Sequence, residues 1–306
     1  PATVSNTSAT AYFFGRQLYE TLQVPIGLIV CPWGGASILA FMSDEALKEF
    51  PEIQLPSADA KGLGIMDPTG IFNGMIHPIL GYNIKGGIWY QGETNRQTPD
   101  LYRKWYRAML EDWRTQWGCG EFPLIFAQIA PFRYADGNSA YIREAQLMCQ
   151  EENKHSYMVS LMDLGEEYDI HPSNKEEVGF RMAARALDKV YGINGIFSDE
   201  PIYKASRTEK NKMILSFKNV SGGLTSYGKP LTSFLIAGKD RKFYPATAQI
   251  RGNELIVYSD KVPEPVAVRY AFTDYAKGCL YNIEGCCASS FRTDDWDEST
   301  CSYSNQ

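Results

Sequence analysis

The chain has 306 residues, a formal net charge of −6 and 13% aromatic residues. The negative charge and the lack of a basic run argue against nucleic acid as a partner, and the lack of an apolar stretch of ~20 residues argues against a membrane span. The aromatic content suits a small polar ligand such as a sugar, although most of the 19 tyrosines and 15 phenylalanines are expected to pack in the interior.

Hydrophobic periodicity predicts alternating helices and strands in the first two-thirds of the chain. Helices are expected at residues 9–22, 99–117, 141–152 and 175–191, and strands at 25–31, 86–90, 123–130 and 157–164. Because helices of this length separate the strands, the connections are expected to be right-handed crossovers. This pattern predicts an α/β fold with three layers, in which helices cover both faces of a parallel sheet.

After about residue 194 the pattern changes to short strand-like runs divided by turn signals. The runs cover residues 212–217, 233–237, 254–258 and 265–270. We therefore predict two domains. Residues 1–193 would form the α/β domain, and residues 194–306 a smaller antiparallel β module.

Glycine-rich and polar segments follow the first two predicted strands, where α/β folds present functional groups. Gly34 and Gly35 either aim a backbone N–H at a ligand or only form a tight turn. Gln91, Glu93 and Asn95 offer amide and carboxylate groups to a ligand. The alternative is that Glu93 caps a helix and Asn95 forms a turn.

The third and fourth predicted strands also lead into polar loops. The third leads into Arg133, which either lines a cleft or turns the chain. The fourth leads towards Asp163, Asp169 and His171. A carboxylate two residues before a histidine suggests a general base and its orienting partner, and Pro172 keeps His171 extended. A lone histidine is, however, more often structural than catalytic.

The other two histidines and the cysteines form no recognisable site. His77 is expected in a packing segment and His155 among solvated charges, so the three histidines supply no metal-ligand spacing. The seven cysteines include no CxxC pair, and disulfides in the C-terminal tail remain an open question. We therefore expect no metal and no cofactor.

Four motifs, in this order, resemble the sialate O-acetylesterases of the SGNH hydrolase superfamily. They are Trp33-Gly34-Gly35, the segment from Trp89 to Asn95, the segment from Arg143 to Gln146, and Asp169-Ile170-His171-Pro172. The likeness continues in the tail at residues 266–270, 280–282 and 291–294. It implies an SGNH-like α/β/α fold, removal of O-acetyl groups from a sialic acid substrate, and a secreted or periplasmic location.

The resemblance also implies roles for single residues. In such enzymes a serine attacks the acetyl ester and a histidine accepts its proton. His171 would be this base and Asp169 its acidic partner, although superfamily members commonly space the two by three residues rather than two. Asp163, Glu93 or a backbone carbonyl are alternatives for the acid. The oxyanion and substrate contacts would come from Gly34, Gly35, Gln91, Glu93 and Asn95.

The nucleophile is the part of the family pattern that this chain does not show. The family serine lies in a Gly-Gln-Ser-Asn block on the first strand, and the chain contains no Gln-Ser pair. We expect the serine and that strand upstream of residue 1, with an N-terminal segment or a second copy of the chain as partner. Ser37 is a weaker candidate because it belongs to the turn at residues 33–37, called the glycine turn below.

Two other functions stay open at this point. Related families share the Gly-Glu segment, so the substrate is either sialic acid or another glycan such as acetyl-xylan. The fold also suits a carbohydrate-binding protein that has lost catalysis.

Overall fold

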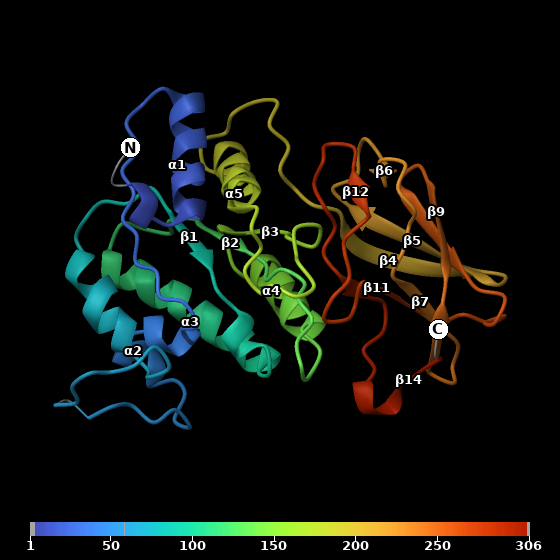
Figure 1. Ribbon diagram of the computed structural model, residues 1–306, viewed down its shortest axis with the longest axis horizontal. Helices are drawn as coiled ribbons and strands as arrows, with labels where there is room; N and C mark the ends of the chain where they lie inside the picture. Colours follow the sequence, from blue (N-terminus) through green and yellow to red (C-terminus); the bar gives the residue numbers. More distant parts are fainter. Residues whose placement is uncertain (1–3, 58, 305–306) are drawn as a thin grey trace. The chain divides into compact units, whose positions relative to one another are not determined.

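The computed structural model describes residues 4–57 and 59–304, which divide into two compact units (Figure 1). The α/β unit contains the residues up to Ile129, together with Tyr141–Val159 and Ser173–Ile196. The β unit contains Ala130–Ala140, Ser160–Pro172 and the residues from Phe197 onward. The loops after two of the strands are therefore grouped with the β unit, and the division at residues 193 and 194 stays a prediction.

The sheet of the α/β unit is parallel and has the order β1-β2-β3. Its strands are β1 (Gly87–Tyr90), β2 (Leu124–Ala127) and β3 (Ser156–Val159). All four residues of β2 are buried, as expected for a central strand covered on both faces. Three of the predicted strands are thus confirmed, although β3 ends earlier than expected and leaves residues 160–174 as a loop.

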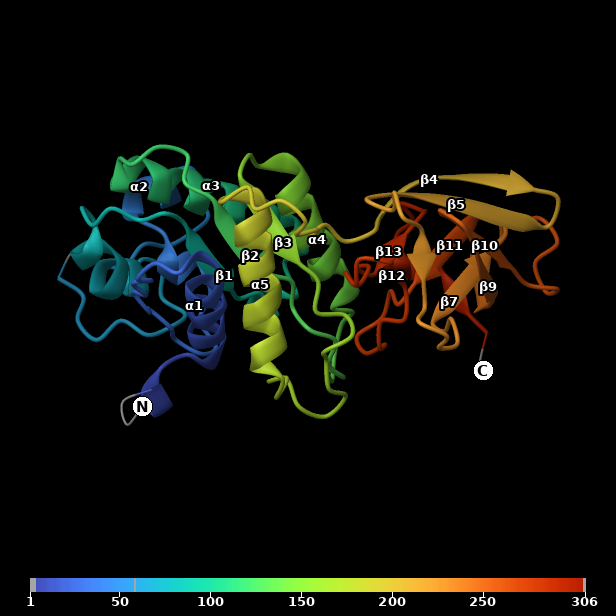
Figure 2. The same ribbon diagram turned by 90° about the horizontal axis from the view of Figure 1, so that it is seen from above.

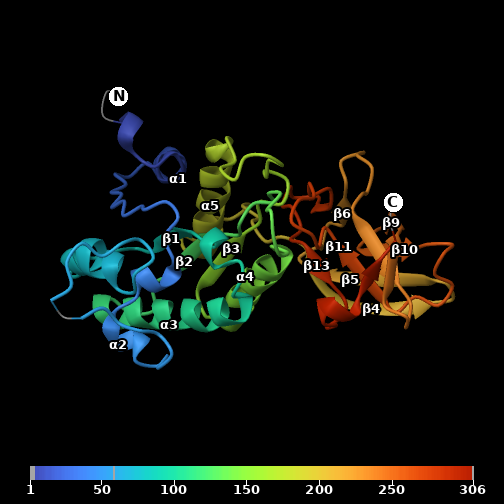
Figure 3. The same ribbon diagram turned by 60° about the horizontal axis from the view of Figure 1, so that its bottom comes forward.

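Helices cover both faces of this sheet, which confirms the predicted layers. They are α1 (Ala9–Leu22), α2 (Asp44–Leu47), α3 (Pro99–Trp117), α4 (Ala140–Glu152) and α5 (Lys175–Lys189). Figure 1 shows α1 and α5 on one side of the sheet and α3 on the other, and Figure 3 shows α3 along that second side. Side-chain caps fix two helix starts, because Ser8 accepts from Ala11 N and Asn174 accepts from Glu177 N.

The predicted strand at residues 25–31 is wrong. This segment has no regular secondary structure, and Leu28 and Ile29 are 40% and 51% exposed. A strand requires a neighbour that satisfies its backbone groups, and among the described residues β1 pairs only with β2. An apolar run therefore does not form a strand by composition alone.

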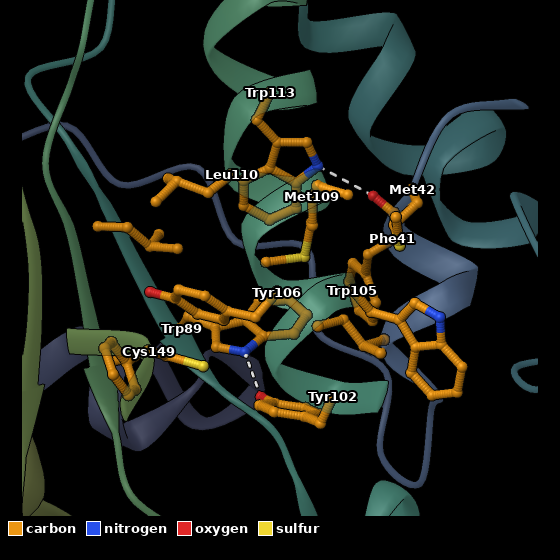
Figure 4. Packing of buried hydrophobic residues seen from close by; sticks show 14 of the residues in the cluster. Phe41, Met42, Trp89, Tyr102, Trp105, Tyr106, Met109, Leu110, Trp113 and Cys149 are labelled. Atoms are coloured by element: carbon orange, nitrogen blue, oxygen red, sulfur yellow. Dashed lines mark hydrogen bonds between the residues drawn. The ribbon is translucent and has the colours of Figure 1, made fainter. Parts of the chain in front are cut away.

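The core of the α/β unit is rich in aromatic side chains from α3 (Figure 4). The ring of Trp89 in β1 packs edge-on against Phe41 and Trp113, with centroids 4.9 and 5.7 Å apart. Trp89 Nε1 donates to the hydroxyl of Tyr102 (3.3 Å), and Trp113 Nε1 to the carbonyl of Phe41 (2.9 Å). The aromatic side chains of α3 therefore pack in the core and contact Trp89 of β1.

The β unit contains two larger sheets and a two-stranded ribbon. Their strand orders are β4-β5-β10-β9, β13-β11-β7-β8-β14 and β12-β6. The strands are β4 (Ile202–Glu209), β5 (Lys212–Lys218), β6 (Leu224–Thr225), β7 (Phe234–Ala237), β8 (Lys242–Pro245), β9 (Thr247–Arg251), β10 (Glu254–Tyr258), β11 (Ala267–Tyr270), β12 (Tyr281–Asn282), β13 (Phe291–Arg292) and β14 (Ser302–Tyr303).

Pairing within the β unit is antiparallel, apart from the parallel pair of β8 and β14. Side chains from both larger sheets, such as Leu255 and Val268, enter one buried cluster. Figure 2 shows β4 and β5 along one side of this unit. The predicted antiparallel module is confirmed.

A buried ion pair explains two of the tail motifs. Arg269 is fully buried, and its guanidinium group donates to both carboxylate oxygens of Asp294, at 3.1 and 2.8 Å. A buried arginine requires such a bidentate partner, because an unpaired charge in the interior is strongly destabilising. This ion pair therefore links the segments at residues 266–270 and 291–294.

The seven cysteines, all within the described ranges, are free thiols. In the part of the chain that the structure describes, no helix combines the length and the apolar character that a bilayer crossing needs.

Candidate active site

The loop after β1 is fastened to the glycine turn by side-chain hydrogen bonds. Gln91 Nε2 donates to the carbonyl of Ala36 (2.9 Å) and to Asn95 Oδ1 (2.7 Å). The hydroxyl of Thr94 donates to the carbonyl of Gly35 (3.0 Å). Two of the segments singled out in the sequence thus lie side by side within the α/β unit.

Asn95 is the centre of this hydrogen-bond network. Its side chain is 6% exposed, and Oδ1 accepts from the backbone N–H of Ile38 (3.1 Å) as well as from Gln91. Nδ2 donates to Ser37 Oγ (3.4 Å). An amide nitrogen carries two hydrogens, so Asn95 keeps one further donor whose direction is set by these contacts.

Two side-chain hydrogen bonds hold the backbone at Gln91, just beyond the end of β1. Its carbonyl accepts from the hydroxyl of Tyr102 (3.2 Å) and from Gln146 Nε2 (3.0 Å). Burial raises the pKa of the Tyr102 phenol above its ordinary value, so the hydroxyl stays protonated and remains a donor. Gln146 Oε1 in turn accepts from the N–H of Ile129 (2.9 Å).

Gly92 is required by this close packing. A Cβ atom there would lie 2.7 Å from Gln146 Nε2 and 2.7 Å from Ile129 Cγ2. Real Cβ atoms do not approach other atoms so closely, so a side chain would push the loop away from α4 or from the segment that follows β2. The glycine of the Gln91–Asn95 segment therefore serves close approach.

The paired glycines differ from each other. Gly35 has a φ of 76°, which favours glycine, whereas a Cβ at Gly34 would meet no atom within 4 Å. Among the described residues, neither backbone N–H has a hydrogen-bond partner. The turn thus presents two unpaired N–H groups, which is what an oxyanion site needs.

Ser37 has a structural role in this turn. It is 3% exposed, and its hydroxyl accepts from Leu39 N (3.3 Å), which caps the 3₁₀ turn Ile38–Phe41. The same oxygen accepts from Asn95 Nδ2. A buried hydroxyl that is used as a double acceptor is poorly placed to attack an ester.

His171 and Asp169 lie together in the Ser160–Pro172 loop of the β unit. Asp169 Oδ1 accepts from the backbone N–H of His171 (2.8 Å) and lies 3.8 Å from His171 Nδ1. The imidazole is 84% exposed and the carboxylate 59%. The ring is therefore open to solvent, and Asp169 holds the backbone of His171 without a hydrogen bond to the ring itself.

Of the alternative acids, Asp163 lies in the same Ser160–Pro172 loop and Glu93 lies in the α/β unit. Asp163 Oδ2 accepts from the hydroxyl of Tyr281 (3.3 Å), and Glu93 begins the 3₁₀ turn Glu93–Asn95 in the α/β unit. The roles of Asp169, Asp163 and Glu93 stay predictions, as do those of the other site residues. Asp169 contacts His171 directly.

Two residues of the network were missed as site residues in the sequence. Gln146 lies within the motif from Arg143 to Gln146 but was assigned no role, and Tyr102 was expected only as part of a helix.

The two histidines that were not expected in the site are both exposed. His77 lies beside the ring of Phe72, and His155 Nδ1 lies 3.3 Å from the hydroxyl of Tyr157.

Comparison with known proteins identifies the family. The model of the family described as carbohydrate esterase, sialic acid-specific acetylesterase, matches residues 4–188. Sialate O-acetylesterases from Pongo abelii and Homo sapiens are each 32% identical to the chain over 216 residues, covering 64% of this chain and 41% of each relative. The chain thus spans less than half the length of these curated relatives.

A solved structure agrees with these matches. The crystal structure of a carbohydrate acetylesterase from Xanthomonas citri superposes with a TM-score of 0.86 at 35% identity, covering 97% of this chain and 67% of that one. The matched family region contains the glycine turn, the Gln91–Asn95 loop and the loop of His171. The chain therefore belongs to the sialic acid-specific acetylesterase family of carbohydrate esterases.

Proposed function

We propose that the protein carrying this chain is an esterase that removes O-acetyl groups from sialic acid by serine-type catalysis. The observation that carries the proposal is the family match over residues 4–188, which spans the motifs of both candidate loops. The SGNH superfamily assignment and a secreted or periplasmic location belong to the same proposal. Both rest on the order of the motifs.

The chemistry assigns a task to each candidate residue. A serine hydroxyl attacks the acetyl carbonyl, and His171 Nε2 accepts the serine proton and then passes it to the departing sugar oxygen. Water, deprotonated by the same imidazole, then attacks the acetyl-enzyme and releases acetate. Asp169 orients His171 by holding its backbone.

The negative oxygen of each tetrahedral intermediate needs donors that are already in place. The remaining N–H of Asn95 and the N–H groups of Gly34 and Gly35 are our candidates. Their positions are set by the bonds from Gln91 and Thr94 to the glycine turn, so they need no reorganisation during the reaction. The exposed imidazole, in contrast, can receive and release a proton.

The test compares acetate release from two substrates by the full-length protein. O-acetylated N-acetylneuraminic acid should be hydrolysed with a higher kcat/KM than acetyl-xylan. Labelling with a fluorophosphonate, followed by mass spectrometry of the labelled peptide, should identify the serine. A preference for acetyl-xylan would support the alternative function, an esterase that acts on acetyl-xylan or another glycan. Glycan binding without acetate release or labelling would support the non-catalytic one.

A further inference from the structure

The loop that carries His171 also presents an exposed aromatic ring. Tyr168 is 77% exposed and lies three residues before His171. Arg133 covers part of it, with the guanidinium carbon 5.5 Å from the ring centroid and Nη1 3.5 Å from the hydroxyl. Tyr168 is thus exposed and yet held by a neighbour from another loop.

Backbone contacts keep these two loops together. A Cβ at Gly165 would overlap the carbonyl oxygen of Pro131, so this glycine allows the two loops to lie in contact. The N–H of Arg133 donates to the carbonyl of Glu167 (3.1 Å), and its guanidinium group forms an ion pair with the carboxylate of the same residue. The position of Arg133 over the ring is therefore fixed at both its backbone and its side chain.

The charge of Arg133 is largely compensated by Glu167. The exposed surface here is accordingly an aromatic face rather than a free cation, which favours a ring-shaped ligand over a bare anion. A sugar presents an apolar C–H face that can stack on an aromatic ring, and an ordered tyrosine loses little side-chain freedom when it does so.

The spacing along the chain agrees with this role. Three residues span at most about 11 Å between Cα atoms, so Tyr168 and His171 lie within reach of one monosaccharide and its acetyl group. Both belong to the same segment of the β unit. We propose that Tyr168, positioned by Arg133, is a sugar-stacking residue that orients the acetylated sugar towards His171. This inference rests on the proposed function and adds a specificity-determining residue to it.

The test separates sugar binding from chemistry in the full-length protein. Tyr168→Ala should raise KM for O-acetylated N-acetylneuraminic acid about tenfold and leave kcat within about twofold, since a lost stacking contact of this size is worth about one factor of ten. Tyr168→Phe keeps the ring and should behave like wild type. Tyr82→Ala, which removes a ring that is 66% exposed elsewhere, is the matched control. Hydrolysis of ethyl acetate should not change in any of the three.

Arg133 acts through Tyr168, and this is tested by a double variant. Arg133→Leu should raise KM for the sugar ester, but it should add nothing in the Tyr168→Ala background. Full additivity would show that Arg133 contacts the sugar independently and would overturn its positioning role. An unchanged KM in Tyr168→Ala, in a protein that hydrolyses the sugar ester, would overturn the whole inference.

A binding measurement distinguishes this failure from failure of the proposed function. Saturation-transfer NMR with N-acetylneuraminic acid reports binding without turnover. We expect transfer in wild type and in Tyr168→Phe, and a loss of about tenfold in affinity in Tyr168→Ala. Loss of binding in Tyr168→Ala from a protein without esterase activity would retain the stacking subsite and reject the esterase. Equal binding by all variants would reject the subsite.

Discussion

The two loops that carry the family motifs are built in opposite ways. In the α/β unit, Gln91 and Asn95 are 8% and 6% exposed and are hydrogen-bonded to the glycine turn. In the β unit, the side chains of Asp169 and His171 are 59% and 84% exposed. The hydrogen bond between them joins the carboxylate of Asp169 to the backbone N–H of His171. In the proposed mechanism, the groups that must stay fixed are therefore buried, and the group that exchanges protons is exposed to solvent.

This contrast predicts how substitutions divide between stability and activity. Changes in the Gln91–Asn95 loop should destabilise the protein as well as inactivate it, because they leave buried polar groups without partners. Changes at His171 should inactivate it with little effect on folding, because an exposed side chain contributes little to stability.

The largest effect on stability is expected for Asn95→Ala. The substitution leaves the N–H of Ile38 and one donor of Gln91 buried without their acceptor, which should cost about 2–5 kcal/mol in the free energy of unfolding. Denaturant titration measures this value. Asn194→Ala, at an exposed asparagine, should change it by less than about 0.5 kcal/mol. Similar values for the two variants would remove the claim of a locked loop.

Gly92→Ala should follow, at about 1–3 kcal/mol, because the added methyl group would press on Gln146 and Ile129. Gly74→Ala is the control, since a Cβ there would meet no atom within 4 Å. Thermal unfolding should show a lowered Tm for the first variant alone. A Tm for Gly92→Ala equal to that of wild type would mean that the loop can accommodate a methyl group, and it would contradict the close packing at Gly92.

Hydrogen exchange sharpens the comparison without any substitution. The N–H of Ile38 donates to a buried side chain, whereas that of His171 donates to an exposed one. We expect exchange at Ile38 to be slower by at least about 100-fold, because it requires the network to open. Comparable rates at the two positions would show that the two loops are equally mobile.

The smallest effect on stability is expected for Asp169→Asn. Asparagine keeps an oxygen that can accept from the N–H of His171 but removes the negative charge 3.8 Å from Nδ1. The free energy of unfolding should change by less than about 0.5 kcal/mol. Steady-state kinetics should show a several-fold lower kcat if Asp169 assists the imidazole, and an unchanged kcat would leave it as a backbone tether.

Sequence patterns located the elements of the α/β unit well where local signals were strong. The bounds of α1 and α3 agree with those expected, because Ser8 caps the first and Gly118, in a left-handed conformation, ends the second. The run at 25–31 failed because strand formation depends on a partner strand. The sequence of residues 25–31 does not show whether a partner strand is present.

For the β unit, the sequence predicted the antiparallel architecture but not all of the strands. β4 was missed because all but two of its eight residues are exposed, so its sequence lacks an apolar pattern. Strands of two residues, such as β12 and β13, have no periodicity to detect. At the site, the glycine and polar clusters identified both loops. The contribution of Gln146 depends on a contact 55 residues away along the chain, which local patterns do not contain.

The proposed mechanism depends most on His171 as the base. The direct test is acetate release from O-acetylated N-acetylneuraminic acid by the full-length His171→Ala protein, measured together with its Tm. We expect kcat to fall by about 10²–10⁴-fold, the usual contribution of general acid–base catalysis, while the Tm stays within about 2 °C of wild type. Wild-type turnover by this variant would contradict the account.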